Sequence, residues 1–435
     1  MKRSTASTTS GTRRTFLKTS AVVSAGVSLT GSAVGALKST DDKVIVGIMG
    51  VNRGSALAPQ FAAVPGVEIR YLCDIDSQRL AVFHEAFSKT VDYAVKIVGD
   101  FRKMLDDPEL DVMVCAAPNH WHAPASILAC AAGKHVYVEK PCSHNAREGE
   151  LLIEAARKHQ RCVQMGNQRR SGEKIIEAMK LLHEGRIGNV YYSRSWYAAN
   201  RGPIGTGTPA EVPPHIDYEL WQGPAPRQPY TSNRLPYNWH WVWNYGNGEL
   251  GNNGIHSIDL SRWGLQVDYP IRVVSSGGRY CFDDDQQTAD TQVVSFKFEG
   301  KKQIVWECLS CNRYGADGSG FGATFHGDQG TLHLSEWGYK LFDEKAKEVA
   351  TVDGTDGLTS HIENFIDAVR HNDSTRLHSD IAEGHKSTLL CHLGNIAYRT
   401  GDSLRCNPAD GHVLDNESAM KFWEREYAPG WEPKV

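Results

Sequence analysis

The sequence predicts an α/β protein in which a doubly wound parallel sheet is followed by an α+β domain built on a large, mostly antiparallel open sheet. Three observations lead to this prediction. The chain has 435 residues, more than one ordinary domain. Short apolar runs alternate with helical patterns up to residue 166, and beyond it strands alternate with long aromatic loops. We therefore expect a Rossmann-type nucleotide-binding domain over 42–166 and a substrate and oligomerisation domain over 167–435.

The first 36 residues resemble a twin-arginine export signal. Residues 12–18 read TRRTFLK, which matches the consensus Ser/Thr-Arg-Arg-x-Phe-Leu-Lys at every position, and a short apolar run rich in small residues follows. Serine and threonine interrupt this run, so it is no membrane span. We expect cleavage near Ala36 and export of the folded protein to the periplasm or another extracytoplasmic space by the twin-arginine machinery. A Ser/Thr-rich terminus without such a role is the alternative.

Charge and cysteine content exclude several classes of function. The net charge is −4, and removal of the five basic residues of the signal leaves about −9, which argues against a nucleic-acid partner. Ten cysteines in a chain of this length do not predict a disulfide scaffold. Cys308 and Cys311 form a C-x-x-C without a second pair or a histidine cluster, so we interpret them as core or strand cysteines and expect no metal.

The periodicity predicts each element in turn. Buried strands are expected at 43–50, 67–74, 112–118, 135–141 and 162–168, with helices between them and a helix over 146–160. In the second half we expect helices at 173–185, 361–372 and 383–401 and strands at 189–197, 271–280, 291–300 and 302–310. Gly185 is placed to end the first of these helices.

The turn after the first strand predicts a dinucleotide site. Gly50, Asn52, Arg53 and Gly54 are the candidate cofactor contacts, because a strand-to-helix turn presents backbone N–H groups to a pyrophosphate. The spacing G-x-N-x-G is one residue short of the usual fingerprint, so an ordinary tight turn stays an alternative. Asp74 lies 24 residues after Gly50, where a carboxylate binds the ribose hydroxyls and disfavours a 2′-phosphate. NAD is thus favoured over NADP, while Asp76 suits a helix N-cap.

Four motifs resemble the glucose–fructose oxidoreductase and inositol dehydrogenase (Gfo/Idh/MocA) family over nearly the whole chain after the signal. They are PNHWHAP at 118–124, GKHVYVEKP at 133–141, GNQRR at 166–170 and GELGNNGIHSIDLSRW at 248–263. The resemblance implies that Lys140 lies beside the nicotinamide and hydrogen-bonds the substrate hydroxyl. It also implies a cofactor lining of Pro118, Asn119, His120 and Glu139.

The same resemblance assigns His256 as the base that takes the hydroxyl proton. Asn252 stands one helical turn earlier, where many members carry an aspartate that orients this histidine. We interpret Asp259 as a helix residue that is structural or faces His256. Arg169 is either a substrate contact or a salt-bridged structural residue, and His122 is either packed or exposed to solvent.

Aromatic residues crowd residues 196–245 in loops rich in Pro, Gly and Asn. We expect a few of them, Trp239 with His240 in particular, to contact a sugar ring, and most to build the walls. Asn238 and Asn244 are candidates to bind hydroxyls. A packed set of loops or a subunit contact is the alternative reading.

These features together predict an NAD(P)-dependent oxidoreductase acting on a hydroxyl of a sugar, glycoside or cyclitol. Export away from the cytoplasmic NAD pool favours a tightly bound cofactor and a redox-neutral cycle. The alternatives are an NAD-dependent glycoside hydrolase or lyase that works by transient oxidation, and a non-catalytic sugar-binding protein of the same fold. The resemblance further implies a homo-oligomer, a dimer or a tetramer.

Overall fold

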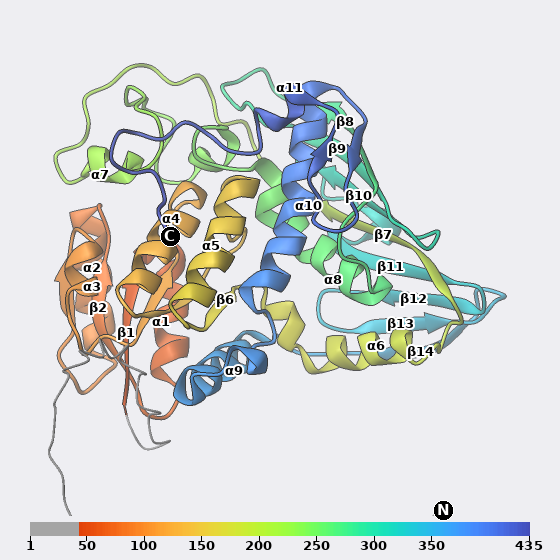
Figure 1. The fold of residues 1–435 in the computed structure, drawn as a ribbon, viewed down its shortest axis with the longest axis horizontal. Coiled ribbons are helices and arrows are strands. Elements are labelled where there is room, and N and C mark those ends of the chain that lie inside the picture. The colour runs from red at the N-terminus through yellow and green to blue at the C-terminus, as the bar shows by residue number, and fades with distance from the viewer. Residues whose placement is uncertain (1–42) are drawn as a thin grey trace, which may run out of the picture. The chain divides into compact units, whose positions relative to one another are not determined.

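A six-stranded parallel sheet organises the N-terminal half of the described chain (Figure 1). The computed structural model describes residues 43–435, so the predicted export signal lies outside the described residues. The strand order is β3-β2-β1-β4-β5-β6. The strands are β1 Val44–Met49, β2 Val67–Cys73, β3 Lys96–Val98, β4 Val112–Cys115, β5 His135–Val138 and β6 Val163–Met165.

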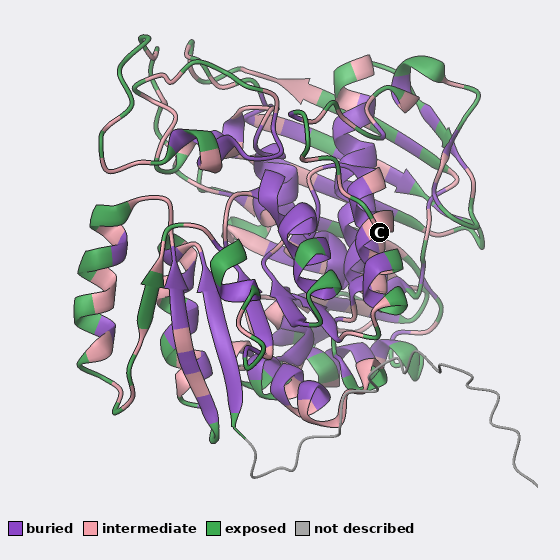
Figure 2. Ribbon diagram, turned by 60° about the vertical axis from the view of Figure 1, so that its left-hand side comes forward, coloured by how far each residue is buried: buried purple, intermediate pink, exposed green. Residues whose placement is uncertain are grey.

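Helices cover both faces of this sheet, as the Rossmann-type prediction requires. They are α1 Val51–Ala62, α2 Ser77–Ser88, α3 Arg102–Leu105, α4 Asn119–Ala131 and α5 Ala146–Lys158. Strands β1, β4 and β5 are buried at every residue, which explains their unbroken apolar sequences (Figure 2). The strand order reverses between β1 and β4, and ligands of such sheets bind in the crevice beside the carboxyl ends there.

The second half is built on a ten-stranded sheet of order β14-β13-β12-β11-β7-β10-β9-β8-β15-β16. Only the central pair β7–β10 is parallel, so the predicted fold class is confirmed. The strands are β7 Val190–Ala198, β8 Arg272–Gly278, β9 Thr291–Lys297, β10 Gln303–Leu309, β11 Phe321–Gly327, β12 Gly330–Leu334, β13 Tyr339–Phe342, β14 Glu348–Val352, β15 Leu404–Cys406 and β16 Val413–Leu414.

One face of this sheet packs against α6 Glu173–His183, α8 Ile255–Leu265 and α10 Ile381–Thr400 (Figure 1). Buried residues alternate with exposed or half-buried ones along β9 and β10, as in a sheet with one covered face. The remaining short elements are α7 Tyr218–Gln222, α11 Glu417–Met420, 3₁₀ turns at Gln168–Ser171, Asn238–Trp241, Ala316–Gly318 and Ser374–Arg376, and a π-helical turn, η3, at Leu250–Gly254. Within residues 43–435, no helix has the length and apolar character that a bilayer span requires.

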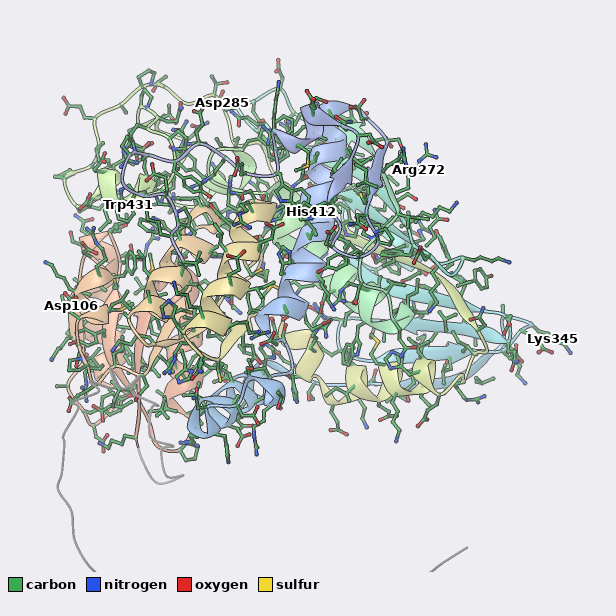
Figure 3. The ribbon with its side chains drawn as sticks, viewed as in Figure 1. Asp106, Arg272, Asp285, Lys345, His412 and Trp431 are labelled. Carbon is green, nitrogen blue, oxygen red and sulfur yellow. The ribbon has the colours of Figure 1, made fainter. Side chains whose placement is uncertain are left out.

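Two segments from the end of the chain pack onto the parallel sheet. Helix α9, Leu358–His371, inserts Phe365 edge-on against Phe61 and Tyr137, with ring centroids 6.3 and 5.7 Å apart. Trp431 lies edge-on to Trp121 of α4 at 5.1 Å, and Figure 3 shows it beside the helices of the parallel sheet. The chain therefore returns after the second sheet to complete the core of the first.

We predict that Phe365→Ala lowers the free energy of unfolding by about 3–5 kcal/mol, because a fully buried ring would leave a cavity between α9 and the parallel sheet. Urea denaturation measures the change. Val82→Ala on the exposed side of α2, where the side chain is 71% exposed, serves as the control and should change stability by less than about 0.5 kcal/mol. Equal effects of the two substitutions would contradict the packing of α9 on this core.

Candidate active site

A cavity of about 800 Å³ opens at the carboxyl edge of the parallel sheet, between that edge, the aromatic loops and the start of α8. The sequence-predicted residues that line it are Gly50, Asn52, Arg53, Asp74, Pro118, Asn119, Glu139, Lys140, Trp239, His240, Asn252 and His256. Gly54, His120 and Arg169 do not line it. The structure thus brings most of the predicted cofactor and catalytic residues into one chamber.

The glycine turn is short because α1 begins immediately after Gly50. Gly50 has φ +89°, and a Cβ there would lie 2.7 Å from the carbonyl oxygen of Ala116 at the end of β4. Only glycine suits both the left-handed backbone and this close approach. Asn52 and Arg53 belong to the first helical turn and line the cavity.

Gly54 has a different role from the predicted cofactor contact. It lies inside α1, and a Cβ at this position would come within 2.6 Å of the Ile48 side chain. The glycine therefore lets the helix pack closely on β1. This close helix–strand packing is one of the uses of glycine in the dinucleotide-binding turn.

Asp74 ties the end of β2 to the glycine turn. Its two carboxylate oxygens accept hydrogen bonds from the Val51 N–H at 2.8 Å and the Asp76 N–H at 2.9 Å. Burial raises the pKa of Asp74, and these N–H donors counteract the shift. The carboxylate retains lone pairs for two ribose hydroxyls. Asp76 caps α2 by accepting from the Arg79 N–H at 3.0 Å, as predicted.

The two histidines of the PNHWHAP motif lie apart: His120 does not line the cavity as predicted, and His122 is buried, as one of its two predicted alternatives requires. His120 is fully buried, bonds the Trp221 carbonyl at 2.7 Å and packs edge-on against Trp221 and Tyr245, away from the cavity. His122 lines the cavity, with its ring nitrogens 2.6 and 2.7 Å from the carbonyl oxygens of Pro141 and Ala117. The reason is that α4 begins at Asn119, so residues two apart face nearly opposite sides of a helix.

Lys140 joins the parallel sheet to the second half of the chain. Its ammonium donates to the backbone oxygen of Asn252 at 2.5 Å and to the Asn252 side-chain oxygen at 3.2 Å. Burial lowers the pKa of Lys140 below its ordinary value, although Glu139 opposes the shift. Glu139 itself pairs with Arg53 at 2.8 Å, which holds this buried acid in its charged form against desolvation. Lys140 is therefore a buried amine whose proton is easier to remove than usual.

His256 lines the cavity near Lys140, but Asn252 does not orient it. The buried Nδ1 of His256 has no hydrogen-bond partner, because the Asn252 amide oxygen bonds Lys140 instead. The one-turn spacing fails because Asn252 lies in the π-helical turn η3, which shifts the facing of the residues before α8. Burial and the charge of Lys140 lower the pKa of His256 well below its ordinary value, so the imidazole is neutral near pH 7.

Arg169 and Asp259 are structural in this arrangement. Arg169 stacks over Phe321 and Trp337, at 3.8 and 4.4 Å from the ring centroids, and bonds the Glu336 carbonyl. Arg169 does not line the cavity, and its pairing with Glu336 at 3.5 Å agrees with the structural one of its two predicted roles. Asp259 is fully buried and pairs with Arg170 at 2.9 Å.

The aromatic loops form the wall opposite the glycine turn. The rings of Trp239 and His240 stack with centroids 3.6 Å apart, and Tyr197, Trp221, Tyr230 and Tyr237 also line the cavity. Burial lowers the pKa of His240 to about 3, so this ring is neutral as well. Asn238 and Asn244, the candidates to bind hydroxyls, donate to the carbonyls of Asn233 and Pro226, and neither lines the cavity.

Sequence reasoning missed an ion pair in the same chamber. Arg201 lines the cavity, stacks over Trp241 at 4.8 Å and pairs with Glu249, with Nη2 3.1 Å from Oε1. Glu249 is 2% exposed and also accepts from the amide of Asn253. Glu249 falls inside the GELGNNGIH motif, which signals its importance, whereas nothing in the sequence around Arg201 marks it.

The residues fit a dinucleotide. The positive-φ Gly50 leaves space at the start of α1 for a pyrophosphate and has no side chain to cap that helix. Asp74 takes the first helical N–H, that of Val51, and faces the same cavity with spare acceptor capacity. The cavity is within the size range of cofactor sites. Gly50, Asn52 and Arg53 would hold the phosphates and Asp74 the adenosine ribose.

Comparison with known proteins agrees with this geometry. Residues 44–167 match the model of the oxidoreductase family's NAD-binding Rossmann fold, and residues 195–432 match that of its C-terminal alpha/beta domain. The chain belongs to the Gfo/Idh/MocA oxidoreductase family, whose N-terminal domain binds NAD.

Curated relatives match only part of their length. A "Glycosyl hydrolase family 109 protein" of Saccharopolyspora erythraea is 31% identical over 209 residues, covering 42% of this chain and 45% of the relative. An "Alpha-N-acetylgalactosaminidase" of Shewanella oneidensis is 28% identical over the same lengths. The chain thus spans less than half of the curated relatives it matches.

Solved structures share the fold across most of the chain. The aldose-aldose oxidoreductase of Caulobacter crescentus, complexed with glycerol, has a TM-score of 0.64 at 18% identity and covers 83% of this chain and 99% of its own. The WlbA dehydrogenase of Bordetella pertussis, in complex with NADH and UDP-GlcNAcA, has a TM-score of 0.64 at 17% identity and covers 84% and 99%.

We predict that Gly50→Ala weakens NAD binding at least tenfold, because the new Cβ meets the Ala116 carbonyl and the backbone at φ +89° is strained for alanine. Titration calorimetry on cofactor-free protein measures the affinity. Gly202→Ala is the matched control, since a Cβ there has no atom within 4 Å. An unchanged affinity in Gly50→Ala would contradict the placement of the cofactor at this turn.

Proposed function

We propose that the protein is an NAD-dependent oxidoreductase acting on a hydroxyl group of a sugar, glycoside or cyclitol. The observation that carries the proposal is that Lys140 and His256 line the same cavity as the glycine turn, close enough for the charge of Lys140 to lower the pKa of His256. Both side chains have pKa values lowered by burial, so each favours its neutral form more than usual. Two such groups beside a cofactor site are suited to proton abstraction from a bound hydroxyl.

His256, Lys140 and Asn252 have separate roles in the proposed reaction. His256 accepts the hydroxyl proton, and Lys140 hydrogen-bonds the same oxygen and stabilises the negative charge that develops on it. Asn252 positions Lys140 through its two oxygen contacts. NAD supplies the acceptor for the hydride that leaves the substrate carbon.

A carbohydrate is the substrate class that this cavity favours. Aromatic faces such as the Trp239–His240 stack suit the C–H faces of a sugar ring, and the Arg201–Glu249 pair and Asn253 supply polar groups for its hydroxyls. Structures of the same fold include a levoglucosan dehydrogenase solved with NADH and levoglucosan.

A second candidate is an NAD-dependent glycoside hydrolase or lyase that oxidises the sugar transiently. The names of the curated relatives, glycosyl hydrolase family 109 and α-N-acetylgalactosaminidase, favour it. The same proton-transfer groups would serve it, since its first step also removes a hydroxyl proton. The two candidates differ in whether hydride returns to the same substrate molecule.

We further propose that the protein is exported through its twin-arginine signal and works with a tightly held cofactor in a redox-neutral cycle. Residues 12–18 support this localisation, and free NAD is scarce outside the cytoplasm. A homo-oligomer is also proposed. The uncovered face of the ten-stranded sheet exposes Tyr191, Val274 and Val293, which suit a contact between copies.

We predict that Lys140→Met lowers kcat/KM by roughly 10²–10⁴-fold while bound NAD is retained, because the amine acts on the substrate oxygen. Stopped-flow absorbance of the bound nicotinamide with candidate sugars measures the rate. Lys158→Met, at the exposed end of α5, is the control and should keep full activity. Full turnover in Lys140→Met would remove this lysine from the mechanism.

The proposal also predicts how the activity depends on pH through the lowered pKa of His256. Because its pKa lies well below 6.5, the base stays neutral as pH falls through 6.5, and the acid limb of kcat/KM appears only below that value. Lys140→Met removes one cation that lowers this pKa, so the pKa of His256 should rise. NMR titration of the imidazole, with His256→Gln to assign its signal, measures both values. A fall of the pKa in Lys140→Met would contradict the proximity of the two groups.

One experiment separates the two candidate reactions. The protein is incubated with aldoses and with aryl α-N-acetylgalactosaminides, and the absorbance of reduced nicotinamide is followed together with the released phenol. Release of the phenol without net accumulation of NADH identifies the hydrolase. Stable reduction of the nicotinamide by an aldose, reversed by a second carbonyl sugar, identifies the oxidoreductase. Neither signal in protein that holds NAD would refute both candidates.

A further inference from the structure

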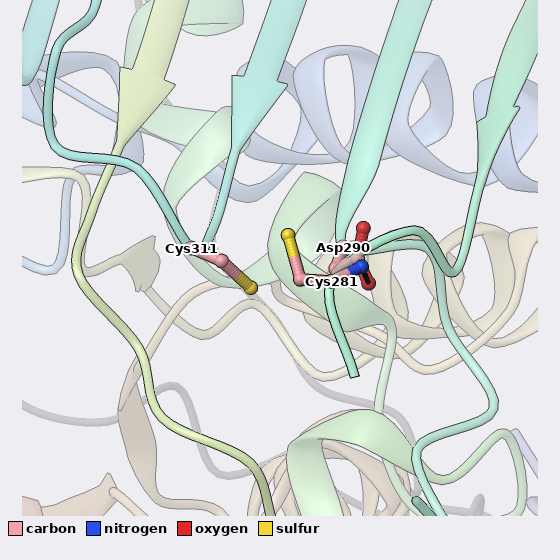
Figure 4. A group of neighbouring side chains, drawn as sticks. All are labelled: Cys281, Asp290 and Cys311. Atoms are coloured by element: carbon pink, nitrogen blue, oxygen red, sulfur yellow. Dashed lines mark hydrogen bonds between the residues drawn. The ribbon is translucent and has the colours of Figure 1, made fainter. Parts of the chain in front are cut away.

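Cys281 and Cys311 form a thiol pair outside the active site. Cys281 follows β8 and is exposed, whereas Cys311 follows β10 and is half-buried. Their sulfur atoms and a carboxylate oxygen of Asp290 all lie within 4.8 Å of one another. Figure 4 shows the two cysteine side chains extending into the same gap between their loops. The other eight cysteines are buried, so this pair is the accessible one.

The pair spans neighbouring strands of the ten-stranded sheet. Strands β8, β9 and β10 are adjacent and antiparallel, and Thr291 at the start of β9 pairs with both Gly278 and Leu309. Cys281 and Cys311 therefore lie just past the same end of the sheet, one on each side of β9. A covalent link between them would join the β8–β9 loop to the segment after β10.

The surroundings disfavour a metal ion at this pair. The two carboxylate oxygens of Asp290 already accept from the N–H groups of Tyr280 and Cys281 and from the Thr291 hydroxyl. Asp290 also pairs with the Arg279 guanidinium at 3.0 Å, which places a fixed positive charge beside the site. Two sulfurs and a carboxylate saturated by donors make a poor zinc site.

We propose that Cys281 and Cys311 are a redox site that forms a reversible disulfide. The exposed Cys281 thiolate attacks a low-molecular-weight disulfide and releases one thiol, and the Cys311 thiolate then displaces the second. Two electrons pass to the external disulfide, and the two protons of the cysteines leave on its thiols. Formation of the bond requires the sulfurs, now within 4.8 Å of each other, to approach to about 2.05 Å, and the exposed Cys281 side chain is the one with room to move.

The order of attack follows from the environment of the two thiols. Burial, together with the neighbouring Cys281, raises the pKa of Cys311 to about 12. Because the thiolate is the attacking species, the less accessible Cys311 is not suited to the first attack. Once Cys281 is held in the mixed disulfide, its sulfur carries no charge and no longer raises the pKa of Cys311, so the Cys311 thiolate forms more readily and displaces the second thiol. Cys281 is accordingly the sulfur that meets the external reagent.

The link would brace the loops that carry the substrate wall. In the β8–β9 loop, Asp284 accepts from the Ile204 N–H at 2.7 Å, Asp285 (labelled in Figure 3) accepts from the Asn233 amide at 2.9 Å, and the Gln287 N–H donates to Trp241 at 2.9 Å. On the other side, the Ser310 carbonyl accepts from the Arg201 N–H at 2.9 Å. A disulfide between these two segments would hold the aromatic loops and Arg201 more firmly in place.

The test uses the full purified chain with oxidised or reduced glutathione. Oxidation should remove the mass of two hydrogen atoms, and peptide mapping should find Cys281 joined to Cys311. The link should raise Tm by roughly 3–6 °C and slow amide hydrogen exchange at 279–290 several-fold. Cys281→Ser should lose all four effects, whereas Cys308→Ala should keep the link, because Cys308 is buried within β10.

Three outcomes would overturn the proposal. The first is that both thiols stay free, or carry only glutathione, after equilibration with the oxidant. The second is a link between Cys308 and Cys311 in place of the expected pair. The third is stoichiometric zinc that is lost in Cys281→Ser, which would make the pair a metal site instead. None of these readouts depends on enzymatic activity, so each stands apart from the proposed reaction.

Discussion

The bond between the Lys140 ammonium and the Asn252 carbonyl is the constraint on which the candidate site depends. Lys140 stands at the carboxyl end of β5, beside the cofactor turn, whereas Asn252 belongs to the π-helical turn before α8. The charged donor thus links the nucleotide-binding edge to the turn that precedes the helix carrying His256, in addition to the packing of α10 on both α5 and α8. A loss of this bond would leave the lysine free to move and would open the chamber between its two walls.

The buried charges around the cavity come from both halves of the chain. Lys140, Arg53 and Arg201 place three cations around the cavity, and Glu139 and Glu249 place two carboxylates there. Arg53 pairs with Glu139 and Arg201 with Glu249. Of these three cations, Lys140 is the one that forms no salt bridge with a described residue, and it donates to a carbonyl oxygen instead. An amine in that position is suited to stabilise negative charge that develops on a substrate oxygen.

Much of the fold could be predicted because it depends on local patterns, whereas the errors arise from long-range contacts. Unbroken apolar runs identified β1, β4 and β5, and the position of Asp74 after β2 identified the nucleotide edge. The sequence gives no sign that α4 begins at Asn119 or that a π-helical turn precedes α8, and these two features moved His120 and Asn252 from their predicted roles. Arg169 was unpredictable for another reason, since Phe321 and Trp337, on which it stacks, follow it by more than 150 residues.

The two cysteines of the C-x-x-C motif show how a sheet separates sequence neighbours. Cys308 lies on an inward position of β10, so alternation buries it, while Cys311 lies beyond the strand end and meets Cys281 from another loop. The C-x-x-C spacing alone would pair Cys308 with Cys311, but Cys308 is buried inside the strand and Cys311 lies beyond its end. The partner that the fold brings to Cys311 is Cys281, which is exposed and belongs to a loop that is hydrogen-bonded to the aromatic loops of the cavity. A disulfide persists in oxidising compartments, and the proposed twin-arginine signal would lead to one. The proposed export would then favour both proposed features, a cofactor carried with the folded chain and a thiol pair that closes in an oxidising compartment.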